Sequence, residues 1–206
     1  MVAHDKLAEE RRVGLEQHAA QHHVRFEVDS PLIEKLAHKG NVYALGVFEK
    51  YESALSKSNH LMLVHPSGLG NIGTILRTMV AFGVRDLALI RPAADVFNPH
   101  IIRAAVGANF LVNVEYFGGL EPYREKFAHR LYPFFLEAQT PLHEAQFTPP
   151  FTLVFGPEWP GLPAVYQNAG TGVVIPQDGA AESLNLGVAV GVALYEARRS
   201  VSQAVS

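Results

Sequence analysis

Two short apolar runs flank a segment with the spacing of an amphipathic helix, and this order constrains the fold of the chain more than any other feature. Residues 61–64 and 87–90 are compact and apolar, as buried strands are. Between them, residues 71–82 place apolar side chains every three or four positions, and Gly83 follows as a helix terminator. A strand, a helix and a strand in this order are typical of a parallel α/β unit. The sequence therefore predicts an α/β fold with a mostly parallel sheet and helices on both faces.

The rest of the chain supplies further candidates for this sheet. Apolar, β-rich runs predict strands at residues 110–116, 132–136, 151–155 and 173–175, with a helix at 122–128. The run 151–155 is apolar at every position but one, so we expect it near the centre of the sheet. A helix is expected from Leu186 to Tyr195, too short at about ten apolar residues to cross a bilayer. No membrane partner is predicted.

Composition narrows the class of protein. Of 206 residues 48% are hydrophobic and 18% charged, which is typical of a folded globular chain. The net charge of −3 argues against a generally basic protein that coats nucleic acid, so any RNA contact must be local. There is no cysteine, and the first residues lack the apolar stretch of a signal peptide. These features favour the cytoplasm.

The N-terminal region differs from the α/β pattern. We expect residues 1–58 to form an N-terminal extension or part of a substrate-binding module, and residues 59–206 to form the main domain. Within the extension, the patterns predict helices at 5–22 and after Ser30, and strands at 24–28 and 41–48. His18 and His22 would share a helix face, a spacing that can hold a metal, but a solvated helix is the preferred interpretation. No metal site is predicted.

A glycine-rich loop precedes the first helix of the α/β unit and allows two interpretations. Residues 68–73 read GLGNIG, which fits the G-x-G-x-x-G fingerprint of dinucleotide binding between a strand and a helix. That fingerprint needs an acidic residue after the second strand, where this chain has Arg91. An arginine there suits a 2′-phosphate, so an NADP-dependent oxidoreductase is one alternative.

Polar residues gather where the last strand passes into the last helix. Ser183 and Asn185 stand at the expected helix start, where backbone N–H groups lack partners within the helix. They can cap the helix, bind a ligand or do both. Behind them, residues 187–193 alternate small with larger apolar side chains, so another helix could pack closely.

Three separated motifs in residues 61–199 resemble the signatures of the SpoU/TrmH family of SPOUT RNA 2′-O-ribose methyltransferases. The first, N-x-G-x-x-x-R-x-x-x-x-F-G, is matched from Asn71 to Gly83 and includes Arg77. The second, G-x-E-x-x-G-L, begins at Gly156 and includes Glu158. The third is Ile175-Pro176 followed by Ser183-Leu184-Asn185 and an apolar helix ending in LYEA. Residues 29–52 weakly resemble part of the ribosomal-protein-like substrate-binding domain that often precedes such domains.

The resemblance implies a fold and a reaction. The expected fold is the SPOUT domain, whose C-terminal portion is threaded into a deep trefoil knot. The expected cofactor is S-adenosylmethionine, and the substrate is a ribose 2′-hydroxyl in structured RNA, tRNA more than rRNA. Family members work as homodimers, with the helix of the third signature helping to form the interface. A non-catalytic RNA-binding protein that keeps the fold is a second alternative.

The resemblance also assigns roles to single residues. Arg77 is the expected catalytic residue, either as a clamp on the adjacent phosphate or as the base, and its high pKa favours the clamp. Asn71, Ser183 and Asn185 would orient Arg77 and the ribose, while Glu158 would fix its loop or the arginine. The expected cofactor contacts are Leu136, Gly156, Ile175, Ser183 and Leu184. Arg103 is expected to contact RNA, and Trp159 is either a packed lid or a stacking surface for a base.

Overall fold

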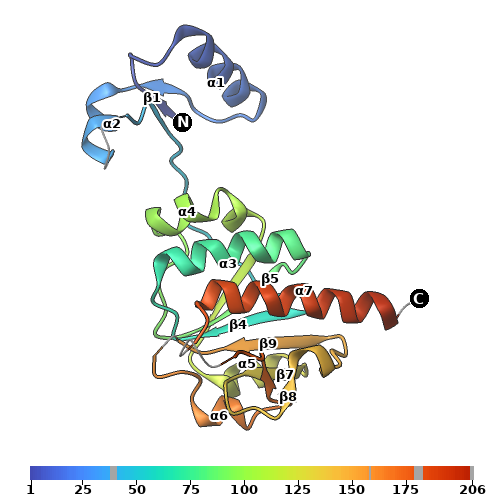
Figure 1. The fold of residues 1–206 in the computed structure, drawn as a ribbon. Helices are drawn as coiled ribbons and strands as arrows, with labels where there is room; N and C mark the ends of the chain where they lie inside the picture. Colours follow the sequence, from blue (N-terminus) through green and yellow to red (C-terminus); the bar gives the residue numbers. More distant parts are fainter. Residues whose placement is uncertain (38–40, 158, 179–182, 205–206) are drawn as a thin grey trace. The chain divides into compact units, whose positions relative to one another are not determined.

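The computed structural model divides the chain into two compact units, Met1–Tyr51 and Glu52–Ser206 (Figure 1). It describes residues 1–37, 41–157, 159–178 and 183–204. For residues 203 and 204 it describes the backbone alone. The larger unit contains all three motif segments and is built around the sheet that the sequence predicts.

The first unit is a small three-stranded sheet with two helices. Its strands lie in the order β2-β1-β3, with β1 parallel to β2 and antiparallel to β3. Asp29 caps the second helix, because its side chain accepts a hydrogen bond from the Leu32 N–H at 3.0 Å. The element bounds are β1 (Val2–Ala3), α1 (Glu9–Gln21), β2 (Glu27–Val28), α2 (Ser30–Leu36) and β3 (Ala44–Leu45).

The strand predicted at residues 41–48 is wrong in its extent, because only Ala44–Leu45 is β structure. These two residues pair with Val2 and Ala3, and β1 is itself two residues long. The chain therefore has no partner with which to extend the ladder. Apolar alternation reports which side chains can face a core, but it does not report the length of the neighbouring strand.

The second unit is a seven-stranded sheet in which every described pairing is parallel. The strand order is β6-β5-β4-β9-β7-β10-β8. The strands β4, β5 and β9 are buried along their whole length, so the predicted central position of residues 151–155 is confirmed. The bounds are β4 (His60–Val64), β5 (Asp86–Ile90), β6 (Asn113–Phe117), β7 (Arg130–Phe134), β8 (Thr140–Pro141), β9 (Phe151–Phe155) and β10 (Val173–Val174).

Helices cover both faces of this sheet, as the sequence predicts (Figure 1). Alternate residues of β4 divide between the two layers. Leu61 and Leu63 pack with α3 (Leu69–Phe82), α4 (Pro99–Ala105) and α7 (Leu186–Ala204), whereas Met62 and Val64 pack with α5 (Leu120–Lys126) and α6 (Ala164–Gln167). Each fully buried aliphatic side chain stabilises the fold by about 1.5–3 kcal/mol. Two short 3-10 turns, η1 (Ala108–Phe110) and η2 (Leu142–Glu144), complete the unit. The trefoil knot stays a prediction.

Helix α3 forms where the apolar period predicts it and ends where glycine permits. Ile72, Ile75, Leu76 and Met79 are buried on its inner side. Gly83 closes the helix with φ of 78°, a left-handed conformation that favours glycine. The predicted helix and its terminator are therefore confirmed.

Two predicted strands are displaced along the chain. The strand expected at residues 110–116 begins only at Asn113, because Ala108–Phe110 forms a 3-10 turn. The strand expected at residues 132–136 spans Arg130–Phe134, so Leu136 follows the strand instead of belonging to it. The shift places Leu136 beyond the carboxyl end of β7, where its side chain is exposed.

Candidate active site

A cavity of about 400 Å³ opens at the carboxyl ends of β7, β9 and β10. This is the edge of a parallel sheet at which α/β proteins bind ligands. Among the described lining residues, Glu137 is the only one with an ionisable side chain, so the wall is mainly apolar side chains and backbone. The residues that line it include Phe134, Leu136, Glu137, Gly156, Trp159, Gly161, Leu162, Gln167, Val174, Ile175, Ser183 and Leu184.

The loop of the second motif is closed tightly at its base. A Cβ atom added to Gly156 would lie 2.5 Å from the Leu162 backbone nitrogen and 2.8 Å from the Gly161 carbonyl carbon, which no side chain could tolerate. Gly161 has φ of 92°, and Leu162 behind it is buried. The Gln167 side chain donates to the Leu162 carbonyl at 2.6 Å. Glu158, expected within this loop, lies outside the described residues.

The five residues predicted to contact the cofactor all line the cavity. They are Leu136, Gly156, Ile175, Ser183 and Leu184, and they come from three separate parts of the chain. The structure brings these segments together, and the side chain of Ser183 is exposed at the cavity. Their contact with a cofactor stays a prediction.

Asn185 connects the start of α7 to the start of α3. Its Oδ1 accepts hydrogen bonds from the Gly187 N–H at 2.9 Å and the Val188 N–H at 3.4 Å, so it caps α7. Its Nδ2 donates to Asn71 Oδ1 at 3.0 Å. Two predicted site residues that are 114 positions apart therefore touch at the margin of the cavity, beside Leu184 and Leu186.

Arg77 lies on the exposed side of α3, six residues after Asn71, and it does not line the cavity. Six residues correspond to about 9 Å along a helix axis. A single copy of the chain therefore brings the other predicted segments together but leaves Arg77 off the cavity wall. The guanidinium makes no hydrogen bond or ion pair with any residue the structure describes.

Arg103 belongs to α4, which crosses α3 at Gly73. A Cβ atom on Gly73 would come within 2.4 Å of the Ala104 side chain and 2.9 Å of the Ile101 carbonyl oxygen. Gly73 and Arg77 are four residues apart and share a face of the helix. The exposed side chains of Arg77 and Arg103 therefore extend from the region where the two helices meet. Neither has an acidic partner among the described residues.

Sequence reasoning missed several residues of the cavity wall. Phe134 and Glu137 adjoin the end of β7, Val174 belongs to β10, and Gln167 comes from α6. The first three stand at or just after a strand, which is a signal that could have found them. Gln167 has no such signal, because only the fold of the loop 156–162 brings α6 to the cavity.

In the described part of the chain, no group of three histidine, cysteine, aspartate or glutamate side chains lies close enough together to hold a metal ion. His18 and His22 do share a face of α1, with ring centroids 4.4 Å apart. Across the same residues, no helix is long and apolar enough to span a membrane.

Comparison with known proteins decides between the interpretations of the GLGNIG loop. A sequence model of the SpoU rRNA Methylase family matches residues 58–195, which include all three motifs. This chain belongs to the SpoU methylase family. The family match also accounts for Arg77, which the dinucleotide fingerprint leaves without a role.

Named relatives of this SpoU-family chain include RNA methyltransferases. A tRNA/rRNA methyltransferase of Synechocystis, itself uncharacterized, is 40% identical over 134 residues, which are 63% of this chain and 49% of that protein. A tRNA (cytidine(34)-2′-O)-methyltransferase of Beijerinckia indica is 34% identical over 148 residues, 68% of this chain and 91% of that protein. The chain spans about half the length of several curated relatives, including 53% of a 23S rRNA (guanosine(2553)-2′-O)-methyltransferase of Bacillus subtilis.

Solved structures agree with the α/β fold of the SpoU-family chain. A structure described as giving insight into 2′-OH methylation of C/U34 on tRNA is 34% identical, with a TM-score of 0.66 over 71% of this chain and 98% of its own. The SpoU methyltransferase AviRb of Streptomyces viridochromogenes, in complex with AdoMet, has a TM-score of 0.84 over 98% of this chain and 82% of its own, at 22% identity. The second likeness concerns the fold alone.

Proposed function

We propose that this chain transfers a methyl group from S-adenosylmethionine to a ribose 2′-hydroxyl in structured RNA. The observation that carries the proposal is the cavity in which the second and third motif segments meet at the carboxyl edge of the parallel sheet. Relatives at 31% and 34% identity are named as 2′-O-methyltransferases of 23S rRNA and of tRNA. tRNA is the preferred substrate class, because the tRNA (cytidine(34)-2′-O)-methyltransferase is matched over 91% of its length.

The cavity suits S-adenosylmethionine in size and in chemistry. Its volume of about 400 Å³ lies within the usual range for small-molecule sites. The backbone of Gly156 lines the cavity, and Ile175, Leu184 and Leu136 supply apolar walls. When bound, the cofactor supplies an electrophilic methyl group on a sulfonium. In this proposal, Ser183 and the backbone at Gly156 orient it.

Arg77 would act on the RNA. A ribose 2′-hydroxyl has a high pKa and must lose its proton as it attacks, so a nearby positive charge favours the reaction. A guanidinium is a poor proton acceptor but a good phosphate ligand. Arg77 would therefore clamp the adjacent phosphate and lower the pKa of the hydroxyl, and Arg103 would bind a neighbouring phosphate. Asn71 and Asn185, already hydrogen-bonded to each other, would hold the ribose side of the site. Glu158 would fix its loop or Arg77.

A homodimer would complete the site. Val188, Val192 and Tyr195 are spaced at i, i+4 and i+7 on α7 and all three are exposed. Helix α7 adjoins α3 near Thr74, since a Cβ atom added to Gly187 would lie 3.5 Å from Thr74 Cγ2, and Arg77 follows Thr74 by one turn of α3. A second copy docked on the apolar stripe would therefore lie beside Arg77, which supports a site assembled from two copies.

The N-terminal unit is assigned to RNA binding in the same proposal. We infer that the first unit, which makes up most of the predicted extension 1–58, serves in substrate binding, and that the second unit, which contains residues 59–206, forms the methyltransferase domain. The extension carries short strands and a capped helix, a framework large enough to present side chains. The whole sequence has no cysteine, and the proposed substrates are RNA molecules. Both features fit the cytoplasm.

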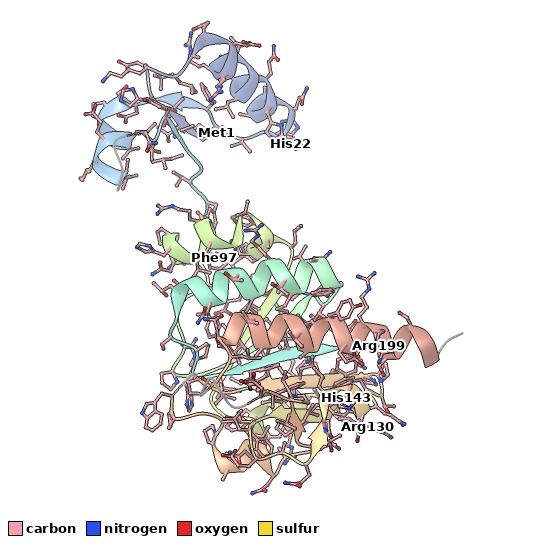
Figure 2. All side chains as sticks on the ribbon, in the orientation of Figure 1. Met1, His22, Phe97, Arg130, His143 and Arg199 are labelled. Atoms are coloured by element: carbon pink, nitrogen blue, oxygen red, sulfur yellow. The ribbon has the colours of Figure 1, made fainter. Side chains whose placement is uncertain are left out.

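Methyl transfer with labelled cofactor tests the proposal. Wild-type protein incubated with total RNA should place label in 2′-O-methylnucleosides after digestion, and Arg77→Ala should lower the rate roughly 10²–10³-fold. Arg130→Ala is the matched control, because Arg130 is exposed at the opposite end of the sheet (Figure 2). It should keep full activity. Cofactor binding without transfer to any RNA would favour the non-catalytic alternative, and equal rates for Arg77→Ala would remove Arg77 from its role.

A further inference from the structure

Trp159 is the single tryptophan of the chain and one of its most exposed side chains. Its side chain is 87% exposed, yet it lines the cavity assigned to the methyl donor. An indole is large and apolar, so leaving it in water forgoes a substantial burial energy. Trp is usually highly buried on average. The position therefore suggests that a ligand or partner covers the ring.

The loop fixes this exposure in the fold. Its two ends meet at the close contact between Gly156 and the Leu162 backbone, and Leu162 is anchored in the core. The Gln167 side chain holds the Leu162 carbonyl at 2.6 Å. Pro157 and Pro160 also have restricted φ angles and no N–H to donate. The ring thus lies at the mouth of the cavity, next to Gly161 and Leu162 at the closed base of the loop.

The chemistry of the mouth favours a flat and uncharged occupant. Leu136 lines the same cavity and is also more than half exposed. Glu137 is the only ionisable side chain among the described lining residues, so the mouth offers an apolar surface instead of a phosphate site. Unpaired RNA bases bind to such surfaces by stacking on aromatic rings. The phosphates would be held elsewhere, at Arg77 and Arg103.

We propose that Trp159 is a positioning residue that stacks on an unpaired base at the target site and so holds the neighbouring ribose at the mouth of the cavity. This inference rests on the proposed function and narrows its substrate. The target nucleotide lies in a single-stranded loop of the structured RNA. A nucleotide within a continuous duplex is a poor substrate, because its base is already stacked on its neighbours.

Tryptophan fluorescence tests the stacking directly. Because Trp159 is the only tryptophan of the chain, all tryptophan emission, excited selectively over the tyrosines, comes from it. The full-length protein is titrated with single-stranded oligo(U), with a blunt oligo(A)·oligo(U) duplex and with S-adenosylmethionine alone. We expect strong quenching by the single strand, little by the duplex and little by the cofactor. Full quenching by the cofactor alone would show that the ring is a lid on the cofactor. A blue-shifted emission that grows with protein concentration would show that a second copy covers the ring. Either result overturns the proposal.

Steady-state kinetics supply a second measurement. Trp159→Ala should raise the KM for total tRNA roughly 10- to 100-fold, whereas Trp159→Phe should keep most of the affinity because it keeps an aromatic face. The affinity for S-adenosylmethionine, measured by calorimetry, should not change in either variant. Val165→Ala, another exposed apolar side chain that does not line the cavity, is the matched control. An unchanged KM for Trp159→Ala would contradict the stacking.

These measurements separate the two proposals. The fluorescence titration requires no methyl transfer, so quenching by single-stranded RNA supports the stacking even if the wild-type protein transfers no methyl group. In that case only the proposed enzymatic activity fails. Conversely, full methyl transfer with no quenching keeps the activity and overturns the role of Trp159.

Discussion

Asn185 illustrates how one side chain can serve both the fold and the site. Its oxygen caps α7, and its nitrogen donates to Asn71. The sequence left three roles open for this residue: helix cap, ligand contact or both. The structure places the cap and the contact with a second predicted site residue on the same amide, so the two roles can be separated by substitution.

Replacing Asn185 should separate stability from activity. Asn185→Ala removes the cap and should lower the free energy of unfolding by about 1 kcal/mol. Asn185→Ser keeps a capping oxygen but is too short to bridge to Asn71, so its stability should stay near that of the wild type while methyl transfer falls. Urea denaturation and the transfer assay give the two values. Full transfer by the serine variant would leave Asn185 with the role of a cap alone.

A buried polar chain lies at the opposite end of the sheet, at the start of β4, β5, β7 and β9. His60 is fully buried, and its Nε2 donates to the Ser56 carbonyl at 2.9 Å. Its Nδ1 must then accept, and the Tyr123 hydroxyl donates to it at 2.7 Å. The hydroxyl oxygen of Tyr123 lies 2.6 Å from Thr152 Oγ1, which lies 3.1 Å from His129 Nδ1. The chain links β4 and β9 with α5 and with the residue that precedes β7.

The buried chain predicts a loss of stability in mild acid. Burial lowers the pKa of His60 from 6.5 to about 4, and the nearby His129, whose own pKa is also lowered by burial, acts in the same direction. Below pH 6.5 the unfolded chain binds a proton that the folded chain does not. Stability should therefore be constant above that pH and should fall as the pH drops from about 6.5 to about 4, by up to about 3 kcal/mol for His60.

Denaturation curves between pH 8 and pH 4.5 measure this dependence. His60→Gln should flatten the slope, because glutamine does not titrate. Burial raises the pKa of Asp86, but hydrogen bonds from Ser56 and Asn113 outweigh it and hold that pKa below its usual value, so Asp86 would weaken the fold only at still lower pH. A wild-type stability that does not change between pH 7 and pH 5 would contradict the account of His60.

At the scale of the elements, the crossing of α3 and α4 depends on Gly73. Gly73→Ala should separate the two helices and destabilise the protein by about 1–3 kcal/mol, because the new methyl group would meet Ala104 and the α4 backbone. Gly70→Ala, in the same helix, has nothing within 4 Å of the added carbon. It should stabilise the protein by roughly 0.5–1 kcal/mol through helix propensity. Thermal unfolding compares the two variants, and equal effects would show that the crossing tolerates a methyl group.

Helix α7 carries the predicted dimer contact. Val192→Asp places a charge in the centre of the exposed apolar stripe and should convert a homodimer to a monomer. Val165→Asp, on the exposed side of α6, is the control and should leave the assembly unchanged. Light scattering coupled to size-exclusion chromatography measures the mass. A wild-type protein that is monomeric at micromolar concentration would remove the dimer from the account.

At the scale of the whole molecule, the sequence predicted the sheet well where its strands are buried on both faces. Runs such as residues 61–64 and 151–155 read directly as strands, because every position but Thr152 is apolar and all are buried. The short strands Ala44–Leu45 and Val173–Val174 depend on their partners, and the sequence carries little information on partner length. The second and third motif matches located the cavity, and Leu136, which belongs to no motif, also lines it. They did not show that Arg77 stays off its wall, because a motif gives spacing along the chain and not the direction in which a helix face points.

Nucleoside mass spectrometry of cellular RNA tests most directly whether the cavity and Arg77 serve ribose methylation. Cells that lack the protein should lose one 2′-O-methylnucleoside from tRNA or rRNA. Wild-type protein should restore it, and Arg77→Ala, produced at the same level, should not. An RNA whose 2′-O-methylation is the same with and without the protein, or one restored fully by Arg77→Ala, would contradict the proposal that this cavity and this arginine serve ribose methylation.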